Sequence, residues 1–573
     1  GGIALGIYSI ILFSNRSRGE GLARIKWDPL VAAISRKRFL TGWTAFIILF
    51  FLFFVILPTI YILSYAFTEW GSIEALLEDQ GRMDLIWGAI GASFQIAGIV
   101  TVIDIVTGLP MAWMLVRKDF RGKNLLDTLI DMPLAVPTAA LGFSSAMFFA
   151  ITDESLQAPS FALGTIGSPY LLIILLHVVF SYPYMVRSLS AILVQIDQTY
   201  ETAGRTLGAS PLTAARTITL PLFRAGLVTG IILCFARSLS ETGGTMIALA
   251  TMANARGFAT GPTLIGEWKD ALDSQPDLAA PLAFVSILLI LLSLALLVVI
   301  KLVVMRVHLP MGRIWPRPER LLSRGVFPKV KDGLAVLFLV VFVLVPSFFI
   351  FTYVGSVEPT AFDWAPFIRS LLYSFLIAGV VTGIDIALGV PLALYIAKNR
   401  SGRLAGALDV LVNVPLIVPT AALGYSLGVF WASQEIVPTH DVLLIVLAHV
   451  AFTYPLVVRN VAGAVEEVDP AYEETARTLG ARPVQAFRRV LYPMVKSSIL
   501  AGAIMAFTRS LGETGATQAV VANAQTAPVY IVDLINLETA AGYYSAGLAC
   551  IMLIVISFLF MLALRYVTNR RAR

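Results

Sequence analysis

The chain has 573 residues, of which 58% are hydrophobic and only 14% are charged. A water-soluble protein of this size cannot bury so much apolar surface, so the composition excludes a soluble enzyme and predicts an all-α polytopic membrane protein. The net charge is +6, but the charged residues are placed as in the loops of a membrane protein, where they set the topology. No nucleic-acid partner is therefore expected. Cys234 and Cys550 lie in apolar runs and have neither disulfide nor metal-site spacing.

Residues 1–39 are interpreted as a separate N-terminal segment. Residues 3–13 are apolar but shorter than the roughly 20 residues of a bilayer helix. Part of a spanning helix, a signal-like segment and a peripheral helix therefore remain open, and we favour the peripheral helix. Residues 14–38 carry seven basic residues against two acidic ones, which is typical of a cytoplasmic flank.

Twelve long apolar runs follow, six in each half, and each is near or above the length that a bilayer helix needs. In chain order we expect spans over residues 40–64, 85–116, 125–150, 169–194, 222–250, 279–305, 333–353, 366–397, 408–432, 441–464, 495–522 and 541–566. This gives a first six-span module (40–305), a basic linker (306–332) and a second six-span module (333–573).

The loops between these spans alternate in charge. The loop after the second span holds four basic residues at 117–123, whereas residues 68–84 hold five acids and one arginine. Basic loops stay on the cytoplasmic side, so we expect both ends of the twelve-span region to be cytoplasmic. Six spans per half give both halves the same orientation, which predicts a pseudo-two-fold axis along the membrane normal.

The two halves repeat each other's sequence. Tyr200 begins YETAGRTLGASPLTAARTITLP, and Tyr472, 272 residues later, begins YEETARTLGARPVQAFRRVLYP. The same register relates RSLSETGGT at Arg237 to RSLGETGAT at Arg509. The repeat therefore indicates one duplicated module, with about ten extra residues in the first half near 151–168.

Each repeated polar loop predicts a short helix that ends at a glycine, Gly208 or Gly480, before a second helix beginning near a proline. Glycine permits a positive φ and the close approach of another backbone. A helix–glycine–helix element on the cytoplasmic face is suited to a groove on a partner. The alternative is an ordinary connecting loop whose likeness merely reflects the duplication.

These loops resemble the signature of permease subunits of binding-protein-dependent ABC importers: E-A-A, three residues, G, nine residues, I-x-L-P. The second copy has ETARTLG and VLYP, and the first has TAGRTLG and ITLP, so the resemblance covers both modules. The first copy departs from the signature, because Thr202 takes the glutamate position and Glu201 lies one residue earlier. The resemblance implies that each loop docks on an ATP-binding subunit and transmits its motion, through Glu201, Thr202, Ala203, Gly208 and Pro211 in one half and Glu474, Thr475, Ala476, Gly480 and Pro483 in the other.

The sequence contains no G-x-x-x-x-G-K-[ST] motif for cradling phosphates. We therefore expect a transport subunit that is not itself an enzyme and binds no cofactor. The resemblance implies two ABC ATPase subunits on the cytoplasmic side, which would bind ATP and Mg, and an external solute-binding protein. It also implies a multi-pass location in the cytoplasmic (inner) membrane of a prokaryote, surrounded by lipid.

The second repeated phrase places ionisable groups inside the fifth spans. Arg237 and Glu241 are four residues apart, as are Arg509 and Glu513, so each pair shares a helix face and is expected to line the bundle interior or a wet cavity. A structural arginine–glutamate clip is the alternative, and both roles can hold. The predicted translocation path or gate comprises Arg237, Glu241, Thr242, Thr245, Arg509, Glu513, Thr514, Thr517 and the span-breaking Pro137 and Pro419.

The phrase RSLGETGAT resembles the R-A-L-G-E-[FY]-G pattern of molybdate, tungstate and sulfate permeases and the G-E-T of phosphate permeases. It therefore favours a tetrahedral oxyanion as substrate, with ferric-iron, thiamine or polyamine permeases as the alternative. An ATP-independent carrier is a further alternative, for which the repeated Asp104 and Asp385 would be candidate ion sites.

Overall fold

The computed structural model describes residues 37–150, 166–252, 255, 257–306, 316–323, 325–357, 359–433, 440–521 and 525–570. The expectations for residues 3–13 and for the basic stretch as far as residue 36 lie outside the described residues. Residues 151–165, which contain most of the predicted insertion in the first half, also lie outside the described residues.

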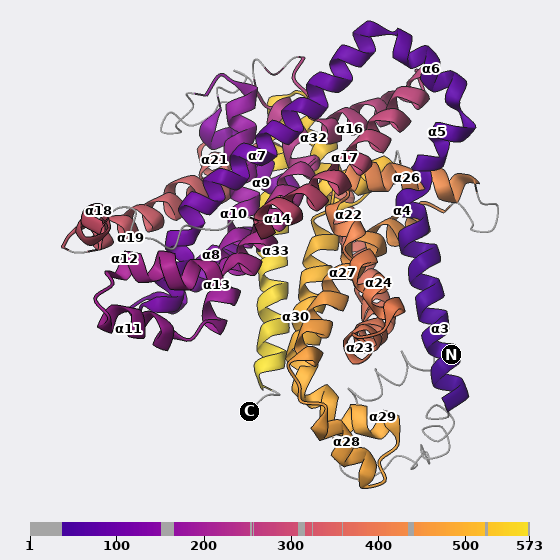
Figure 1. The fold of residues 1–573 in the computed structure, drawn as a ribbon. Helices are drawn as coiled ribbons and strands as arrows, with labels where there is room; N and C mark the ends of the chain where they lie inside the picture. Colours follow the sequence, from indigo (N-terminus) through magenta and orange to yellow (C-terminus); the bar gives the residue numbers. More distant parts are fainter. Residues whose placement is uncertain are drawn as a thin grey trace, which may run out of the picture.

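The first half is a series of helices interrupted by short π and 3₁₀ turns (Figure 1). In chain order its elements are α3 (Lys37–Phe50), η1 (Phe51–Ile56), α4 (Leu57–Tyr61), η2 (Ile62–Ser64), α5 (Tyr65–Thr68), α6 (Trp70–Glu78), α7 (Gln80–Arg117), α8 (Lys123–Ala135), α9 (Thr138–Phe149), α10 (Pro169–Gln195), α11 (Gln198–Thr206), α12 (Pro211–Ala214), η4 (Ala215–Thr219), α13 (Leu220–Leu222), α14 (Arg224–Leu239), α15 (Gly243–Ala250), α16 (Gly261–Ala271), η5 (Pro276–Leu278) and α17 (Ala279–Arg306).

The second half repeats this order after one linker helix. Its elements are α18 (Pro316–Leu322) in the linker, then α19 (Phe327–Phe338), η6 (Leu339–Leu344), α20 (Val345–Phe348), α21 (Ile350–Ser356), α22 (Trp364–Ile384), η7 (Asp385–Gly389), α23 (Val390–Lys398), α24 (Arg403–Leu411), α25 (Val414–Ile417), α26 (Thr420–Ser433), α27 (Asp441–Glu466), α28 (Ala471–Thr478), α29 (Pro483–Ala486), η8 (Phe487–Leu491), α30 (Tyr492–Leu511), α31 (Gly515–Val520), α32 (Ala527–Ile535) and α33 (Ala540–Arg570).

Among the described residues, nine helices are long and apolar enough to cross a membrane, and three bent helix pairs would raise the number to twelve. The third predicted span of each half is one of these pairs: the chain bends by 103° between α8 and α9 and by 107° between residues 403–417 and α26. Pro137 and Pro419 follow Val136 and Val418, whose extended backbone is the conformation that a following proline favours. The prolines thus break these spans, as predicted, and residues 125–150 and 408–432 are not straight helices.

The fifth spans are also interrupted. In the first half, residues 211–222 and 227–239 form the third bent pair, with an angle of 75°. Further along, α14 ends at Leu239 and α15 begins at Gly243, while α30 ends at Leu511 and α31 begins at Gly515. The predicted runs 222–250 and 495–522 are therefore each broken within the repeated glutamate–threonine–glycine phrase.

The first span of each half packs against the other half. The α4 helix lies on α26, and α20 lies on α9. The Ser426 hydroxyl donates to the Pro58 carbonyl at 2.6 Å and accepts from the Ile62 amide at 3.0 Å. In the opposite direction, Ser144 donates to the Pro346 carbonyl at 2.6 Å and accepts from the Ile350 amide at 2.9 Å. These matched contacts fasten the two halves together.

Ser426 also belongs to a G-x-S-x-G pattern, Gly424 to Gly428, of the kind that presents a nucleophile in some hydrolases. Here the pattern lies inside α26, and the Ser426 side chain is fully buried and bonded as just described. It therefore serves as a contact between the halves.

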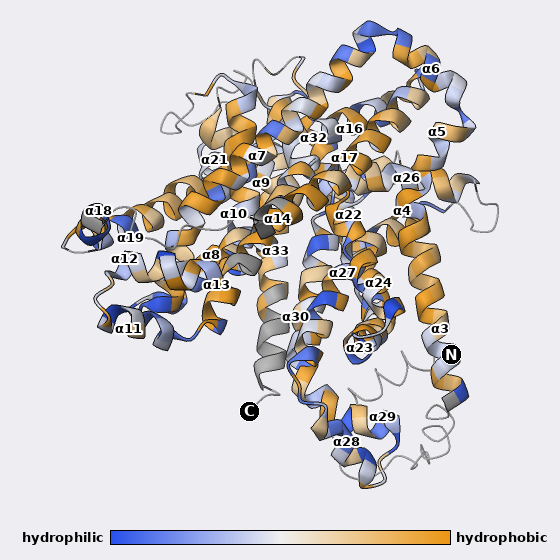
Figure 2. Ribbon diagram, viewed as in Figure 1, coloured by the Kyte–Doolittle hydropathy of each residue, from blue (hydrophilic) through white to orange (hydrophobic). Residues whose placement is uncertain are grey.

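Polar residues gather at two opposite ends of the molecule (Figure 2). We call the end that carries α11, α18 and α28 the basic end, and the end that carries α6 and α16 the acidic end. Long apolar helices such as α3 and α17 run between them (Figure 2). This arrangement suits a protein whose middle lies in lipid and whose ends face water.

Candidate functional site

Two polar loops at the basic end have nearly the same geometry. We name them loop 1 (residues 198–219, containing α11, α12 and η4) and loop 2 (residues 471–491, containing α28, α29 and η8). The φ angle is 89° at Gly208 and 87° at Gly480. A Cβ atom built at either glycine meets nothing within 4 Å, so backbone conformation rather than crowding is what requires glycine there.

The same local interactions end the first helix of each loop. The amide of the residue after the glycine bonds back to the helix, Ala209 to the Gly204 carbonyl at 3.1 Å and Ala481 to the Ala476 carbonyl at 3.0 Å. Pro211 and Pro483 then begin α12 and α29, where a proline has no helical amide bond to lose. The predicted helix–glycine–helix elements are thus present in both loops.

Both loops expose large apolar side chains at equivalent positions. Leu207 is 86% exposed and Leu479 is 84% exposed, and Tyr200 and Tyr472 are each 58% exposed. These loops lie at the basic end and beyond the apolar helices, so lipid does not account for the exposure (Figure 2). Exposed apolar residues with a polar surround are typical of a protein contact surface.

One glutamate in each loop points inward instead. The Arg117 Nε atom lies 3.1 Å from Glu201 Oε1, and the Lys398 Nζ atom lies 2.5 Å from Glu473 Oε2. Glu201 is therefore the counterpart of Glu473, and it does not replace Glu474 from one residue earlier. Thr202 and Glu474 are both exposed, as are Ala203 and Thr475, whereas Ala476 is half-buried.

The second repeated phrase forms an arginine–glutamate clip across the broken fifth span. Arg237 Nη1 lies 2.6 Å from Glu241 Oε2, and Arg509 pairs with Glu513 in the same way. The other carboxylate oxygen of Glu241 accepts from the Gly244 amide at 2.9 Å, and that of Glu513 accepts from the Ala516 amide at 3.0 Å. Each glutamate thereby joins one helix to the start of the next.

The two arginines are also stacked on aromatic rings. The Arg237 guanidinium carbon lies 5.0 Å from the Phe180 ring centroid, and that of Arg509 lies 5.2 Å from the Phe452 centroid. Such stacking adds a favourable cation–π contribution to the ion pair. In this conformation each arginine is thus engaged by a carboxylate and a ring, which describes a clip better than an open anion site.

The halves meet at the two breaks. A Cβ atom built at Gly243 would lie 2.3 Å from the Thr514 Cβ atom, and one built at Gly515 would lie 2.6 Å from the Thr242 Cβ atom. The Thr138 hydroxyl, just after Pro137, donates to the Gly512 carbonyl at 3.0 Å. The Thr420 hydroxyl, just after Pro419, donates to the Ser240 carbonyl at 3.2 Å. The predicted residues Thr242 and Thr514 therefore lie where the halves touch, and Pro137 and Pro419 directly precede the threonines that bond across this contact.

Thr245 and Thr517 directly follow Gly244 and Ala516, and each contacts a buried histidine of its own half. The His177 Nε2 atom is 2.9 Å from the Thr245 hydroxyl, and its Nδ1 atom is 2.8 Å from the Ser238 hydroxyl. His449 makes the same two contacts, with Thr517 and Ser510. Each threonine thus helps to hold a buried histidine, and its predicted place on the translocation path remains a prediction.

Asp104 and Asp385 are fully buried, each in the second span of its half. Each accepts a hydrogen bond from the fourth span: from Ser181 to Asp104, and from Thr453 to Asp385 at 2.6 Å. These bonds tie the second span to the fourth, while the other carboxylate oxygen of each aspartate is buried without a hydrogen-bond partner.

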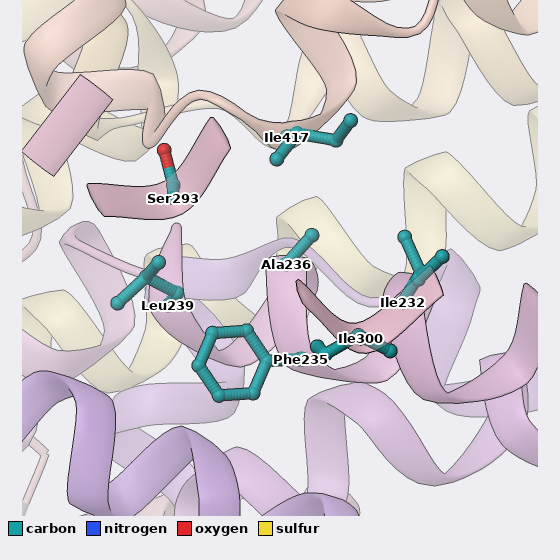
Figure 3. Close-up of a pocket in the computed structure, with 7 residues that line it drawn as sticks. All are labelled: Ile232, Phe235, Ala236, Leu239, Ser293, Ile300 and Ile417. Carbon is teal, nitrogen blue, oxygen red and sulfur yellow. The ribbon is translucent and has the colours of Figure 1, made fainter. Parts of the chain in front are cut away.

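A small pocket lies between the halves near the fifth and sixth spans (Figure 3). Its lining is Ile232, Phe235, Ala236 and Leu239 from α14, Ser293 and Ile300 from α17, and Ile417 from α25. The Ser293 hydroxyl already donates to the Ile290 carbonyl at 3.0 Å. The pocket is thus apolar and does not suit a charged substrate.

Comparison with known proteins explains the duplicated geometry. Residues 104–309 and 389–573 each match the family described as "Binding-protein-dependent transport system inner membrane component". The chain belongs to this family. It contains the family domain twice and is an ABC permease of the binding-protein-dependent importers, with several apolar helices that make it a multi-pass membrane protein.

The similar curated proteins are permeases named for oxyanions or molybdenum. The chain is 28% identical over 212 residues to the molybdate/tungstate transport system permease protein of Methanocaldococcus jannaschii, covering 37% of this chain and 79% of that protein. It is 29% identical over 225 residues to the sulfate transport system permease protein of Salmonella typhimurium, covering 39% and 80%. It is 34% identical over 166 residues to the molybdenum transport system permease protein of Escherichia coli, covering 28% and 70%. This chain is about twice as long as such relatives, which fits a fused permease.

Proposed function

We propose that the chain supplies two membrane modules of an ATP-driven importer, in which loop 1 and loop 2 each dock on one ABC ATPase subunit. The observation that carries this proposal is the pair of nearly identical exposed loops at the basic end, each with a positive-φ glycine and an exposed leucine. The excess of basic residues at that end favours a cytoplasmic orientation. Because the sequence has no phosphate-cradling motif, ATP and Mg would bind to the partner subunits.

The broken fifth spans suggest how docking would move the path. The last turns of α14 and α30 bear the clip arginines Arg237 and Arg509, and the same helices begin just after loop 1 and loop 2. A shift of loop 2 would therefore reach the contact of Thr242 and Thr514 through α30, and a shift of loop 1 would reach it through α14, beyond the 75° bend between residues 211–222 and 227–239. Closing and separation of the two ATPase subunits would open and close that contact, which is alternating access.

The proposed substrate is a tetrahedral oxyanion such as molybdate, tungstate, sulfate or phosphate. It is supported by the names of the similar permeases. Because both arginines are paired with glutamates, we assign most of the selectivity to an external solute-binding protein at the acidic end.

One observation favours a second candidate, an importer of a cation such as ferric iron, thiamine or a polyamine. Glu267 and Asp270 lie on α16, and Asp533, on α32, is close enough to Asp270 to raise its pKa. Carboxylates at this end would repel an oxyanion and attract a cation. Uptake by the reconstituted complex of molybdate and sulfate, compared with ferric iron, thiamine and a polyamine, would decide between the two substrate classes.

The ATPase docking is tested by copurification. The chain should bring down its cognate ABC ATPase in a ratio of two ATPase subunits to one chain, because it presents two loops. Simultaneous Leu207→Asp and Leu479→Asp substitutions should abolish the copurification, whereas Leu85→Asp at the far end of the molecule should not. A wild-type chain that purifies without an ATPase, and transports its substrate in the absence of ATP, would contradict the proposal and favour an ATP-independent carrier.

A further inference from the structure

The linker between the halves folds against loop 1. The α18 helix lies beside α12 at the basic end (Figure 1). Its Glu319 is only 7% exposed. One carboxylate oxygen accepts from the Thr213 hydroxyl at 2.5 Å, and the other lies 2.7 Å from Arg216 Nε. Both partners belong to loop 1.

The residue after α18 adds a backbone contact. The Ser323 hydroxyl accepts from the Leu212 amide at 3.0 Å and donates to the Glu319 carbonyl at 2.6 Å. Leu212 lies in the first turn of α12, where a helix leaves its amides without intrahelical partners. The linker thus satisfies one of these amides, and it binds loop 1 through side-chain and backbone atoms together.

Glu319 is suited to a lasting contact. The Thr213 hydroxyl, with a smaller contribution from the Arg216 guanidinium, lowers the pKa of Glu319, so the carboxylate is ionised throughout the neutral range. Hydrogen bonds to an ionised group are about twice as strong as those between neutral groups. The Arg216 side chain is 19% exposed, so solvent screens this pair less than an ordinary surface pair.

Loop 2 is held in a different way. By the register of 272, Val484, Gln485 and Arg488 stand where loop 1 has Leu212, Thr213 and Arg216. Gln485 accepts from the Arg482 amide at 2.9 Å, which is a contact within loop 2 itself, and Arg488 is exposed. Thr213 in loop 1 thus donates to a residue of the segment that joins the halves, whereas its counterpart Gln485 is bonded within its own loop.

We infer that the linker is a strap that holds loop 1 in its docking geometry through Glu319 and Ser323, so that the two ATPase contacts of the fused chain are unequal. The functional half of this inference rests on the proposed docking of both loops. Loop 1 would be a preset contact that moves together with the linker and α19. Loop 2 would be the contact that adjusts when the ATPase subunits close.

Hydrogen exchange of the full chain in lipid nanodiscs tests the strap within one molecule, because loop 2 is an internal control. In the wild type, amides of residues 209–217 should exchange more slowly than those of residues 481–489. Glu319→Ala combined with Ser323→Ala should speed exchange in loop 1 by about tenfold, as expected for losing charge-assisted and backbone hydrogen bonds. Loop 2 should be unaffected, which also shows that the variant is folded. Gln485→Ala should have the opposite pattern and loosen only loop 2.

Equal rates of amide hydrogen exchange in the two loops of the wild type would contradict the proposed strap. Faster amide exchange in both loops of the double variant would contradict it as well. The functional half is tested in the complex with the ATPase by the number of ATP molecules hydrolysed per solute imported. The double variant should raise this ratio several-fold, and an unchanged ratio would overturn unequal docking. Failure of the wild type to bind an ATPase would instead contradict the proposed function, while the exchange contrast would still decide whether the strap exists.

Discussion

At the scale of single residues, the repeated glutamates do more than neutralise an arginine. Glu241 and Glu513 are each 3% exposed, and each uses one oxygen for the arginine and the other for the first turn of the next helix. A carboxylate at the start of a helix also suits the helix dipole. The sequence predicted the arginine–glutamate pairing from a spacing of four residues. It could not predict the second bond, because a continuous helix was expected there.

Glu513→Gln should therefore destabilise the chain by about 3 kcal/mol, because it leaves the Arg509 cation buried without its carboxylate. Thermal or denaturant unfolding of the purified chain would measure this loss. The exposed Glu474→Gln should change stability by less than about 0.5 kcal/mol. Adding Arg509→Met to Glu513→Gln should recover much of the loss, and a double variant no more stable than Glu513→Gln would argue against the pair as its source.

A second residue-scale prediction concerns pH. Burial, and after it the nearby Asp533 carboxylate, raise the pKa of Asp270 to about 6, against the opposing effect of Lys269. A carboxyl whose pKa is raised on folding destabilises the folded state when it ionises, so stability should increase as the pH falls through about 6 toward the unfolded value near 4. The neighbouring Glu267, whose pKa is also raised by burial, should contribute in the same direction.

Asp270→Asn should thus raise the melting temperature at about pH 7.5 and have little effect at about pH 4.5. Asp273→Asn, on the exposed segment just after α16, is the matched control and should not change the pH dependence. A melting temperature of the Asp270 variant that runs parallel to the wild type across this range would contradict the assignment.

At the scale of elements, the main feature that sequence reasoning missed is that the first span of each half packs against the other half. Length and hydropathy predicted spans over residues 40–64 and 333–353, but they contain no information on which half each span would contact. The contact depends on Ser426 and Ser144, each far in sequence from its partners. By contrast, the breaks at Pro137 and Pro419 followed from local backbone sterics and were predicted correctly.

Removing the hydroxyl of Ser144 or Ser426 should weaken the contact between the first span of one half and the other half. Ser144→Ala leaves the buried Ile350 amide without its acceptor and should cost about 1–3 kcal/mol, and Ser426→Ala should cost a similar amount through the Ile62 amide. The exposed Ser274→Ala should be nearly neutral. The measurement is unfolding of the purified chain, and two serine variants as stable as the control would mean that apolar packing alone holds the first spans.

At the scale of the whole molecule, the duplication was readable from sequence, and its asymmetry was not. Equal loop lengths, glycines and prolines predicted two similar loops on the same face. The sequence showed Glu201 one residue before the signature glutamate position, and only the structure shows that Glu201 and Glu473 both point inward, to Arg117 and Lys398. The contact of α18 with loop 1 joins residues about a hundred positions apart, so no local sequence pattern predicts it. The domain boundaries proposed at residues 39, 305 and 332 remain predictions.

The central claim is that loop 1 and loop 2 transmit ATPase motion to the contact between the halves. The most direct measurement is ATP hydrolysis and solute uptake, taken together, for the reconstituted complex with Gly208→Val or Gly480→Val. Valine is strained at the positive φ of either glycine, so each variant should distort its loop, lower uptake at least several-fold and leave the ATPase hydrolysing ATP without transport. The control Gly88→Val, at an exposed helical position with open space around it, should transport normally. Uptake and ATP hydrolysis that stay coupled as in the wild type in both loop variants would contradict the account.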